Sequence, residues 1–509
     1  MKVQIGLVLL LFLSTANSLK ILGMFPIPIL SHFKFFHSIL RELADAGHDV
    51  TVVSHFPDND APVNYKDLLL PKSDLALNSV DLEVFKNAPW STYIVTFWRL
   101  QQNGFKECDL IFSSPVLQTI LKSNQKFDVI LLEQFNNDCL MAVAWKLKTP
   151  VIALSSCLLL PWHYDRIGNP LFPSYIPNVL VGYSNKMNFF QRFNNWIGVN
   201  VLNLMYQYIT VPETDKIIQK YMKNDNVPSV SELVKETSLM FVNTHYSISG
   251  SRPMTPMMIE LGGIHIKEKK PLDPELKALL DSAKNGVIYV SWGSMIRGSS
   301  LPDDKRKILL NTFASLKQKV LWKFENDTLQ DQPKNVFIRK WLPQRDILCH
   351  PNVRAFISHG GLLGISEAVY CGIPIIVTPF FGDQFQNAAT VEARGIGYIV
   401  RYRDMTEETI KIAITNALSP EALQRAKTVS YSFRNRPMKP AEAAVWWVEY
   451  VSATRGAPLL KSHANNLSVF TYYSFDIYIT IATGLIVIIA LCIFIIRMCF
   501  GRRNKSKTD

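Results

Sequence analysis

Residues 355–378 read AFISHGGLLGISEAVYCGIPIIVT, and the order of these residues indicates how the chain folds. The apolar run at 355–358 has the composition of a buried strand, and it leads into a glycine pair at 360–361. A helical segment starts near Ile365, and a second apolar run follows at 373–378. Strand, turn, helix and strand in this order predict one unit of a parallel sheet, with the glycine turn at its carboxyl edge.

Two series of such apolar runs alternate with helical segments along the chain. The predicted strands of the first series lie at residues 20–25, 47–53, 127–132 and 150–154. Those of the second series lie at residues 286–291, 320–324, 336–338, 355–358 and 373–378. We therefore predict an α/β fold with two Rossmann-like domains in series, at residues 19–266 and 267–474. The proline-rich, basic stretch 267–274 is the expected linker.

Both ends of the chain carry segments typical of targeting and anchoring. Residues 1–18 contain Lys2, an apolar run and small residues before an expected cleavage after Ser18, as a secretory signal peptide does. Residues 475–496 include an apolar run of the roughly 20 residues that span a bilayer. Tyrosines precede this run and basic residues follow it, which predicts a lumenal body and a cytosolic tail at 497–509.

The tail and two sequons favour the endoplasmic reticulum. Lys505 and Lys507 are fifth and third from the carboxyl end, a spacing that resembles the dilysine retrieval signal of membrane proteins of that organelle. A generic basic stop-transfer tail is the alternative interpretation. Asn326 and Asn466 begin lumenal sequons that can carry glycans. We expect a single-pass protein of this membrane with its body in the lumen.

The composition is that of a folded protein without a nucleic-acid partner. The chain is 48% hydrophobic and 19% charged, which excludes a disordered chain. Its formal net charge is +12, but no stripe of lysine and arginine with interleaved aromatics is present, so nucleic acid is not expected as a partner. The seven cysteines are scattered. We therefore expect no disulfide framework and assign the stability to the hydrophobic core.

The quoted stretch also predicts an anion-binding site. Its glycine pair lies between a strand and a helix, so that backbone N–H groups and a helix N-terminus point to one spot, as they do around a pyrophosphate. A His-Gly-Gly triplet alone is weak support, because glycine pairs are common in turns. Two further segments, 341–344 (WLPQ) and 380–384 (FFGDQ), are expected at the same carboxyl edge, where open α/β sheets bind ligands.

Taken together, these segments resemble the UDP-glycosyltransferase family, and in particular its invertebrate-like, membrane-bound animal members. The shared motifs run from 341–344 through 358–361 and Glu367 to 383–384, and the similarity extends to both ends of the chain. The resemblance implies the GT-B arrangement, in which two Rossmann-like domains face each other across a cleft, here with a single carboxyl-terminal transmembrane helix. It also implies an enzyme that transfers a hexose from a UDP-sugar.

Carried over by motif, the resemblance assigns the donor site. Trp341 would stack on uracil, and Gln344 would hydrogen-bond the edge of the base. Glu367 would accept hydrogen bonds from the ribose, while Asp383 and Gln384 would bind sugar hydroxyls. The expected phosphate contacts are Ser294, His359, Gly361 and Gly364.

The chain departs from the vertebrate pattern at one phosphate position. Leu363 stands where vertebrate members often have asparagine, so one side-chain contact to phosphate is missing. We expect backbone groups to compensate for it.

The resemblance places the catalytic base in the loop after the first strand, where His32 follows Ser31. A histidine suits this role because its pKa lies near neutrality, and a carboxylate can orient it. His37 is the weaker competitor. For the carboxylate, Asp138 and Glu133 are alternatives after the strand at 127–132, and we favour Asp138 because its surroundings resemble the invertebrate pattern.

The expected reaction is a single in-line displacement. His32, held by Asp138, takes the acceptor proton while the acceptor oxygen attacks the anomeric carbon and UDP leaves with inversion. The helix N-terminus and His359 would stabilise the phosphate charge. No Asp-x-Asp motif lies near this cleft, so we expect neither a metal ion nor a cofactor besides the UDP-sugar.

The donor and acceptor are predicted less sharply. Val242 stands where glucuronosyl-transferring relatives often have an arginine, so UDP-glucose is favoured and UDP-glucuronate is the alternative. The acceptor is expected to be small and lipophilic, such as a phenol, a polycycle or a steroid. Aromatic residues suggest its apolar cavity: Phe33, Phe35, Phe36, Trp90, Phe97, Trp98 and the aromatic stretch from Phe189. The stretch 189–209 has two interpretations. It either packs in the hydrophobic core, or it forms an exposed helix that faces the acceptor entrance or the membrane.

Two other functions are possible for a chain of this fold and location. A non-catalytic binding protein of the same fold would be expected to lose some of the proposed site residues, and all are present. A transferase for proteins or lipids would share the compartment but would require a macromolecular acceptor. A homo- or hetero-oligomer is compatible with the sequence.

Overall fold

A computed structural model of the protein describes residues 18–73, 82 and 93–505. Its contacts group the chain into two compact units, Met1–Leu460 and Lys461–Asp509. Apart from Ser18, the predicted signal peptide lies outside the described residues, as do Trp90 and the end of the tail with Lys507.

The first sheet of the larger unit has seven parallel strands within the described residues, in the order β3-β2-β1-β4-β5-β6-β7. The strands are β1 (Lys20–Phe25), β2 (Asp49–Ser54), β3 (Tyr65–Leu69), β4 (Val129–Glu133), β5 (Val151–Ser155), β6 (Thr237–Val242) and β7 (Met258–Glu260). Every residue of β4, β5 and β6 is buried, because helices cover both faces of a parallel sheet.

The second sheet has six parallel strands in the part of the chain that the structure describes, in the order β10-β9-β8-β11-β12-β13. They are β8 (Val287–Ser291), β9 (Lys319–Lys323), β10 (Val336–Arg339), β11 (Val353–Ser358), β12 (Ile375–Val377) and β13 (Gly397–Ile399). The predicted α/β class with two parallel sheets is confirmed. The domain boundaries themselves stay predictions.

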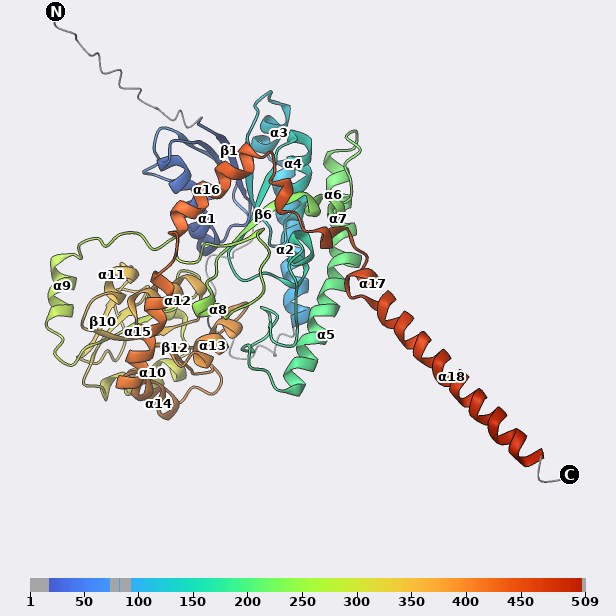
Figure 1. Cartoon of the computed structure of the whole chain (residues 1–509). Coiled ribbons are helices and arrows are strands. Elements are labelled where there is room, and N and C mark those ends of the chain that lie inside the picture. Colours follow the sequence, from blue (N-terminus) through green and yellow to red (C-terminus); the bar gives the residue numbers. More distant parts are fainter. Residues whose placement is uncertain (1–17, 74–81, 83–92, 506–509) are drawn as a thin grey trace, which may run out of the picture. The chain divides into compact units, whose positions relative to one another are not determined.

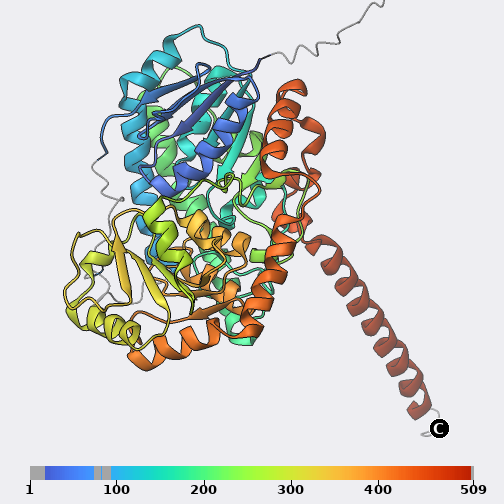
Figure 2. The same ribbon diagram turned by 90° about the vertical axis from the view of Figure 1, so that its left-hand side faces the viewer.

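Helices surround both sheets (Figures 1 and 2). Those of the first half are α1 (Leu30–Asp45), α2 (Tyr93–Ser113), α3 (Pro115–Lys122), α4 (Met141–Leu147), α5 (Phe189–Met205), α6 (Val211–Tyr221), α7 (Val230–Leu233) and α8 (Tyr246–Ser249). Those of the second half are α9 (Pro274–Asp281), α10 (Asp303–Ala314), α11 (Gln344–Leu348), α12 (Leu362–Cys371), α13 (Gln384–Ala393), α14 (Glu407–Ala417), α15 (Pro420–Arg434) and α16 (Pro440–Ala453).

The core lies on both faces of each sheet. Along β4, Val129 and Leu131 belong to one buried cluster and Ile130 and Leu132 to another, because successive side chains of a strand point to opposite faces. The second sheet repeats the arrangement with two clusters of its own. This double burial explains why the sequence shows continuous apolar runs instead of alternating ones.

Each sheet has one point where the chain order reverses. It lies between β1 and β4 in the first sheet and between β8 and β11 in the second. Ligands of open α/β sheets bind at such points, beyond the carboxyl ends of the strands. His32 follows β1 and Glu133 ends β4, whereas Ser294 follows β8 and His359 follows β11.

Helix α16 follows the second sheet in sequence but packs on the first. Its buried residues Ala444, Val448 and Val451 belong to the same apolar cluster as residues of β1 and α1. Helix α16 packs against α1, and Figure 1 shows the two helices side by side. The chain therefore returns to the first sheet after the second one is complete.

The smaller unit contains α17 (Val469–Tyr472) and the long helix α18 (Phe475–Lys505). Its part Phe475–Met498 has 24 residues with a mean hydropathy of 3.0. Such a helix is about 36 Å long, enough to cross the hydrocarbon core of a bilayer. Among the described residues it is the one helix that passes this test of length and composition, and it contains the predicted span 475–496.

The expectation of no disulfide framework is wrong. Cys108 of α2 is bonded to Cys139, which follows β4, and Cys349 after α11 is bonded to Cys371 of α12. The partners are 31 and 22 residues apart, so they look scattered in the sequence, and only the packing of the helices brings them together. Both bonds lie next to residues of the candidate site.

Candidate active site

Two turns of the second sheet close around the ring of His359. Gly293 follows β8 with a φ of +77°, and a Cβ atom there would lie 2.7 Å from Cε1 of His359. A Cβ atom on Gly361, which precedes α12, would lie 2.4 Å from Nε2 of the same ring. Larger residues would clash, so both glycines are required for this close approach. Ser294 lies in the turn beside Gly293, and its role as a phosphate contact stays a prediction.

The His359 ring is uncharged at neutral pH. Burial, with a smaller contribution from the Lys323 ammonium, lowers the pKa of His359 to about 4. Its Nδ1 atom is buried and has no hydrogen-bond partner within the described residues. A neutral imidazole can donate one hydrogen bond to an anion without carrying a positive charge.

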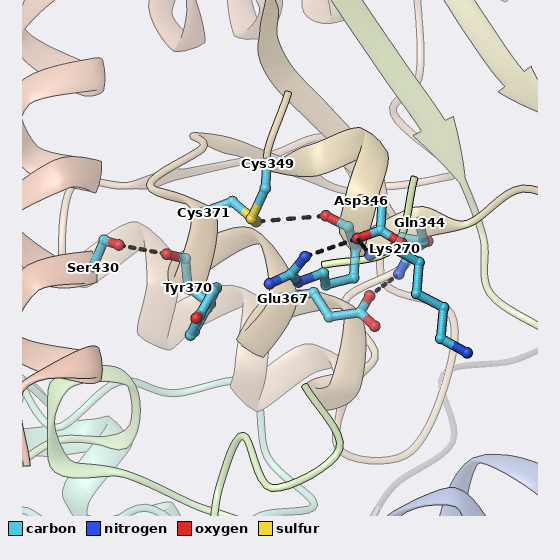
Figure 3. The surroundings of a disulfide bond; sticks show 9 residues. Lys270, Gln344, Asp346, Cys349, Glu367, Tyr370, Cys371 and Ser430 are labelled. Carbon is cyan, nitrogen blue, oxygen red and sulfur yellow. Dashed lines mark hydrogen bonds and ion pairs between the residues drawn. A yellow bond between two sulfur atoms is a disulfide. The ribbon is translucent and has the colours of Figure 1, made fainter. Parts of the chain in front are cut away.

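Gln344 and Glu367 form a hydrogen-bonded pair on neighbouring helices (Figure 3). The Nε2 group of Gln344, at the start of α11, donates to Oε2 of Glu367 in α12 at 2.6 Å. Burial raises the pKa of Glu367, and the Gln344 hydrogen bond and the charge of Lys34 oppose that rise. Gly364 allows the approach of the Gln344 amide, since a Cβ atom there would lie 3.2 Å from Nε2. The Cys349–Cys371 disulfide ties the same two helices together.

Trp341 presents its ring at the surface beside this pair. Its side chain is 65% exposed, which is unusual for a tryptophan and leaves a ring face available for stacking. The ammonium of Lys34, from α1, lies 5.0 Å from the centre of the ring in a cation–π contact. Lys34 was missed by the sequence analysis, because an isolated lysine on an amphipathic helix carries no motif.

Asp383 and Gln384 begin α13 beside the glycine turn. Asn387 donates to Oδ2 of Asp383 at 2.8 Å and to the carbonyl of Gly360 at 3.0 Å. The Oε1 atom of Gln384 accepts from the backbone N–H groups of Phe380 and Phe381. The oxygen of this amide therefore holds its own loop, and its Nε2 group is the end suited to a ligand.

His32 is paired with Glu133 in the first sheet. Nδ1 of His32 lies 2.7 Å from Oε1 of Glu133, whose side chain is 1% exposed, whereas His32 is 19% exposed. The ring of Phe135 contacts the His32 ring edge-on, with centroids 5.1 Å apart. The neighbouring strands β1 and β4 bring the two residues to the same edge of the sheet. The imidazole is thus oriented by a carboxylate and a ring and keeps one edge accessible.

Asp138, the favoured sequence candidate, is not the partner of His32. Its carboxylate accepts two hydrogen bonds from Arg166, at 2.7 and 2.5 Å, and one from the Tyr206 hydroxyl at 2.7 Å. Asp138 and Arg166 are both almost completely buried. The expected His32–Asp138 contact is therefore corrected to His32–Glu133, because Asp138 turns into the interior where Arg166 neutralises it. His37 pairs with Asp58 instead, at 2.8 Å.

The two halves of the site meet across the sheets. The hydroxyl of Ser31 contacts the sulfur of Met295 at 4.0 Å, so the start of α1 faces the loop after β8 that carries Ser294. His32 lies in the first turn of α1 and not in the preceding loop, where the sequence had placed it. Burial raises the pKa of Asp383, and the hydrogen bond from Asn387 and the nearby His32 oppose the rise. The Asp383 carboxyl of the second sheet therefore lies in the neighbourhood of His32 of the first.

Leu363 makes an apolar contact and a backbone contact with the first half of the larger unit. Its side chain packs against the buried cluster of the first sheet, and its carbonyl lies 3.3 Å from Nε2 of His265. Burial lowers the pKa of His265 to about 4, so this imidazole is neutral. The residue that departs from the vertebrate pattern thus joins the two halves of the larger unit.

Several aromatic residues expected at the acceptor cavity lie elsewhere. Phe33, Phe35 and Phe36 are buried in the core of the first sheet, so the prediction that they line a cavity is wrong. Phe97 is also buried, with its ring against Trp162 at 5.2 Å, whereas Trp98 is 47% exposed. Their spacing fits the buried face of a helix as well as it fits a cavity.

The aromatic residues of α5 are exposed, which excludes core packing for them. The outward side chains are Phe189, Phe190, Phe193 and Trp196. The residues of α5 that face the core are Asn195, Gly198, Val199 and Leu202. The second interpretation of this stretch, an exposed helix near the acceptor entrance or the membrane, stays a prediction.

Comparison with known proteins agrees with this geometry. A sequence profile described as "UDP-glucoronosyl and UDP-glucosyl transferase" matches residues 23–506. UDP-glucosyltransferase 2 of Dactylopius coccus is 37% identical over 97% of this chain and 95% of its own length. UDP-glucuronosyltransferase 1A7 of Mus musculus is 28% identical over 94% of this chain and 92% of its own length.

A solved structure extends the comparison to the fold. The structure of CalG4, the calicheamicin glycosyltransferase, superposes with a TM-score of 0.60 over 87% of this chain and 100% of its own. The sequence identity of that pair is 17%, so the likeness concerns the arrangement of the two sheets, the GT-B fold.

Proposed function

Since the chain belongs to the UDP-glucuronosyl and UDP-glucosyl transferase family, and is therefore a UDP-glycosyltransferase, we propose that it transfers glucose from UDP-glucose to a hydroxyl group of a small lipophilic acceptor. The observation that carries the proposal is the pair of His32 and Glu133 on the first sheet, which faces the loop after β8 of the second through the contact of Ser31 with Met295.

In the proposed reaction, His32 acts as the general base. Glu133 accepts the Nδ1–H hydrogen bond and so leaves Nε2 unprotonated to take the proton of the acceptor hydroxyl. The acceptor oxygen forms the new bond to the anomeric carbon while the bond from that carbon to the UDP oxygen breaks. UDP leaves on the opposite side, and the configuration is inverted. The mechanism assigns no step to a metal ion or a further cofactor.

The second sheet is proposed to bind the donor. Trp341 would stack on uracil, and the Gln344–Glu367 pair would bind the base and the ribose. The diphosphate would lie at the turns around His359, beside Ser294 after β8 and the backbone N–H groups of Gly361 and Gly364 at the N-terminus of α12. Asp383 and the Nε2 group of Gln384 would hold the sugar hydroxyls.

Glucose is favoured over glucuronate by the apolar environment at one position. Val242 ends β6 with its side chain completely buried in the core of the first sheet. An apolar side chain there gives a sugar carboxylate no charged partner. The relative named UDP-glucosyltransferase 2 is also more similar to this chain than the relative named UDP-glucuronosyltransferase 1A7, at 37% against 28% identity.

The membrane location is part of the same proposal. Helix α18 would anchor the protein, and the basic residues after it would hold the tail in the cytosol, so that the larger unit lies in the lumen of the endoplasmic reticulum. A lipophilic acceptor that partitions into the bilayer would be concentrated near the enzyme in this location.

The direct test is acceptor-dependent release of UDP by microsomes that contain the full chain. UDP-glucose and UDP-glucuronate would each be offered with a panel of phenols, with His32→Ala as the inactive variant. We expect turnover with UDP-glucose that the variant abolishes. Turnover only with UDP-glucuronate would overturn the donor assignment, and turnover that survives in His32→Ala would overturn the base. No release with either donor would favour a binding protein of the same fold.

A further inference from the structure

The first turns of helix α1 present one face to the second sheet. Ser31 and Lys34 are three residues apart, so their side chains lie on the same side of the helix. The Ser31 hydroxyl contacts the sulfur of Met295, and the Lys34 ammonium lies 5.0 Å from the centre of the Trp341 ring. Two separate contacts therefore direct this face of α1 to the half of the larger unit that carries the proposed donor site.

The packing of α1 fixes which of its side chains point outward. Phe33 and Phe35, on either side of Lys34 in the sequence, are buried in the core of the first sheet, whereas Lys34 is exposed. Because the apolar face holds the helix against the core, the lysine remains on the outer face. The segment that contains His32 thus also brings an ammonium group to Trp341.

The Lys34 ammonium has no counter-charge within bonding distance. Among the described residues it forms neither a hydrogen bond nor an ion pair. Basic residues near Trp341 in the sequence are already paired: Lys340 with Asp327 at 2.8 Å, and Arg345 with Asp346 at 2.7 Å. Lys34 is therefore a cation that the fold holds at the nucleotide side of the proposed donor site and leaves available to an anion.

The electrostatic surroundings of Lys34 include residues proposed for the ribose and for the phosphates. Desolvation lowers the pKa of Lys34, the charge of Glu367 opposes that fall, and the charge of Lys323 adds to it. Lys323 donates to the carbonyl of Gly293 at 3.1 Å, and Gly293 is the glycine that faces the His359 ring. Lys34 is thus in the electrostatic neighbourhood of Glu367 and of the turn before His359.

The diphosphate is the part of UDP-glucose that fits this cation. It carries the negative charge of the donor, whereas uracil and ribose offer neutral hydrogen-bonding groups. An anion beside Lys34 would supply its counter-charge and offset the repulsion from Lys323. A lysine ammonium has three donors on a flexible four-carbon stem, so it can follow a phosphate oxygen without a rigid geometry.

We propose that Lys34 is a donor-binding residue supplied by the first half of the larger unit, and that its ammonium pairs with the diphosphate of the UDP-sugar. The inference rests on the proposed function, because it concerns the donor of that site. Lys34 lies two residues after His32 in α1, so one helix carries both the base and a cation for the leaving group. The nucleotide is then held from both halves of the larger unit.

The test compares ligands that differ only in their phosphates. The full chain in detergent would be titrated with uridine, UMP and UDP, and the readout is the ratio of the Kd for uridine to the Kd for UDP. In Lys34→Met, which keeps an unbranched side chain and removes the charge, this ratio should fall by about tenfold. Any effect of the lost ring contact on uracil stacking acts on all three ligands and cancels in the ratio. A loss shared by UMP assigns the contact to the α-phosphate, and a loss confined to UDP assigns it to the β-phosphate.

Two matched variants separate this ammonium from surface charge in general. Lys340→Met removes the lysine that directly precedes Trp341 but pairs with Asp327, so the ratio should stay unchanged. Lys34→Arg keeps the positive charge and should retain most of the ratio of the unmodified protein. An equal fall of the ratio in both methionine variants would overturn the inference, and so would an unchanged ratio in Lys34→Met.

Salt dependence tests the ionic character of the contact. The difference between the unmodified protein and Lys34→Met should shrink as sodium chloride is raised, because salt screens exposed charges. A difference that does not depend on salt would overturn the ion pair. Failure of the proposed function is seen in another experiment, as UDP release that is absent or indifferent to His32→Ala. UDP binding that depends on Lys34 supports the inference even then.

Discussion

The Nδ1 atom of His32 lies 2.7 Å from Oε1 of Glu133, the last residue of the neighbouring strand. The register of β1 and β4 fixes the start of both loops, and the ring of Phe135 limits the rotation of the imidazole. A buried carboxylate that accepts from Nδ1 selects the tautomer whose Nε2 atom can take a proton. Loss of the Glu133 carboxylate should therefore impair proton transfer to His32.

Glu133→Gln should lower kcat by about 100-fold or more, with a much smaller change in the KM for UDP-glucose, because an amide cannot stabilise the imidazolium that forms during proton transfer. Steady-state kinetics with a fixed phenol would measure both constants. The midpoint of thermal unfolding should stay within a few degrees of that of the unmodified protein. An unchanged kcat would contradict the assignment.

Asp138→Asn should act on stability instead. It leaves the buried guanidinium of Arg166 without a counter-charge, and removal of one member of a buried ion pair costs about 3–5 kcal/mol. We expect a lower unfolding midpoint and less folded protein, with kcat per folded molecule largely retained. Circular dichroism in detergent and titration of active sites would separate the two effects. A stable protein with a kcat reduced as in Glu133→Gln would restore Asp138 as the catalytic carboxylate.

His359 should make folding sensitive to mild acid. Its pKa is about 4 in the folded protein against 6.5 as the ordinary value, so the unfolded chain binds more protons between these two pH values. Stability is therefore present above pH 6.5 and decreases as the pH falls toward 4, by about 2–3 kcal/mol from this residue. His359→Asn should flatten the dependence of the unfolding free energy over this range. An identical slope in both proteins would show that the imidazole is not desolvated.

Leu363→Asn should tighten UDP binding. An amide at the start of α12 can donate to a phosphate oxygen, and a hydrogen bond to a charged group contributes about 1.5–3 kcal/mol, equivalent to roughly a tenfold or greater fall in Kd. Leu363→Ala is the matched control, because it removes the same apolar contact without adding a donor. Isothermal titration with UDP would compare the three proteins. Equal affinities would show that backbone groups already satisfy the phosphate.

Replacement of Cys108 and Cys139 by serine should destabilise the first half of the larger unit by about 2–4 kcal/mol, since the bond closes a loop of 31 residues. We also expect a change in acceptor preference, because α2 and the segment after Glu133 are no longer joined. The double variant at Cys349 and Cys371 should affect UDP binding instead, through Gln344 and Glu367. Differential scanning calorimetry and acceptor kinetics would distinguish the two. Equal effects of both pairs on acceptor preference would contradict this division.

The sequence was sufficient to predict the two sheets and to place two segments, with His359 and with Asp383, at the carboxyl edge of the second sheet. Buried parallel strands give continuous apolar runs, and a glycine turn after such a run marks the carboxyl edge, so His359 and Asp383 were placed from local patterns alone. Their roles in binding stay predictions.

The choice between Glu133 and Asp138 could not be made from local patterns. Both follow the same strand, and the outcome depends on Arg166, a partner 28 residues further along the chain that draws Asp138 inward. The disulfides and the burial of Phe35 and Phe36 were missed for a related reason, since each depends on which face of a helix meets its neighbour. Such contacts are set by tertiary packing, which one sequence does not display.

The return of α16 to the first sheet means that the polypeptide crosses between the two halves of the larger unit twice, once near the linker and once before Pro440. Two covalent connections restrict the relative movement of the halves more than a single linker would. A fragment that stops before Pro440 would lose the second connection and would expose the apolar face of α1 that α16 covers.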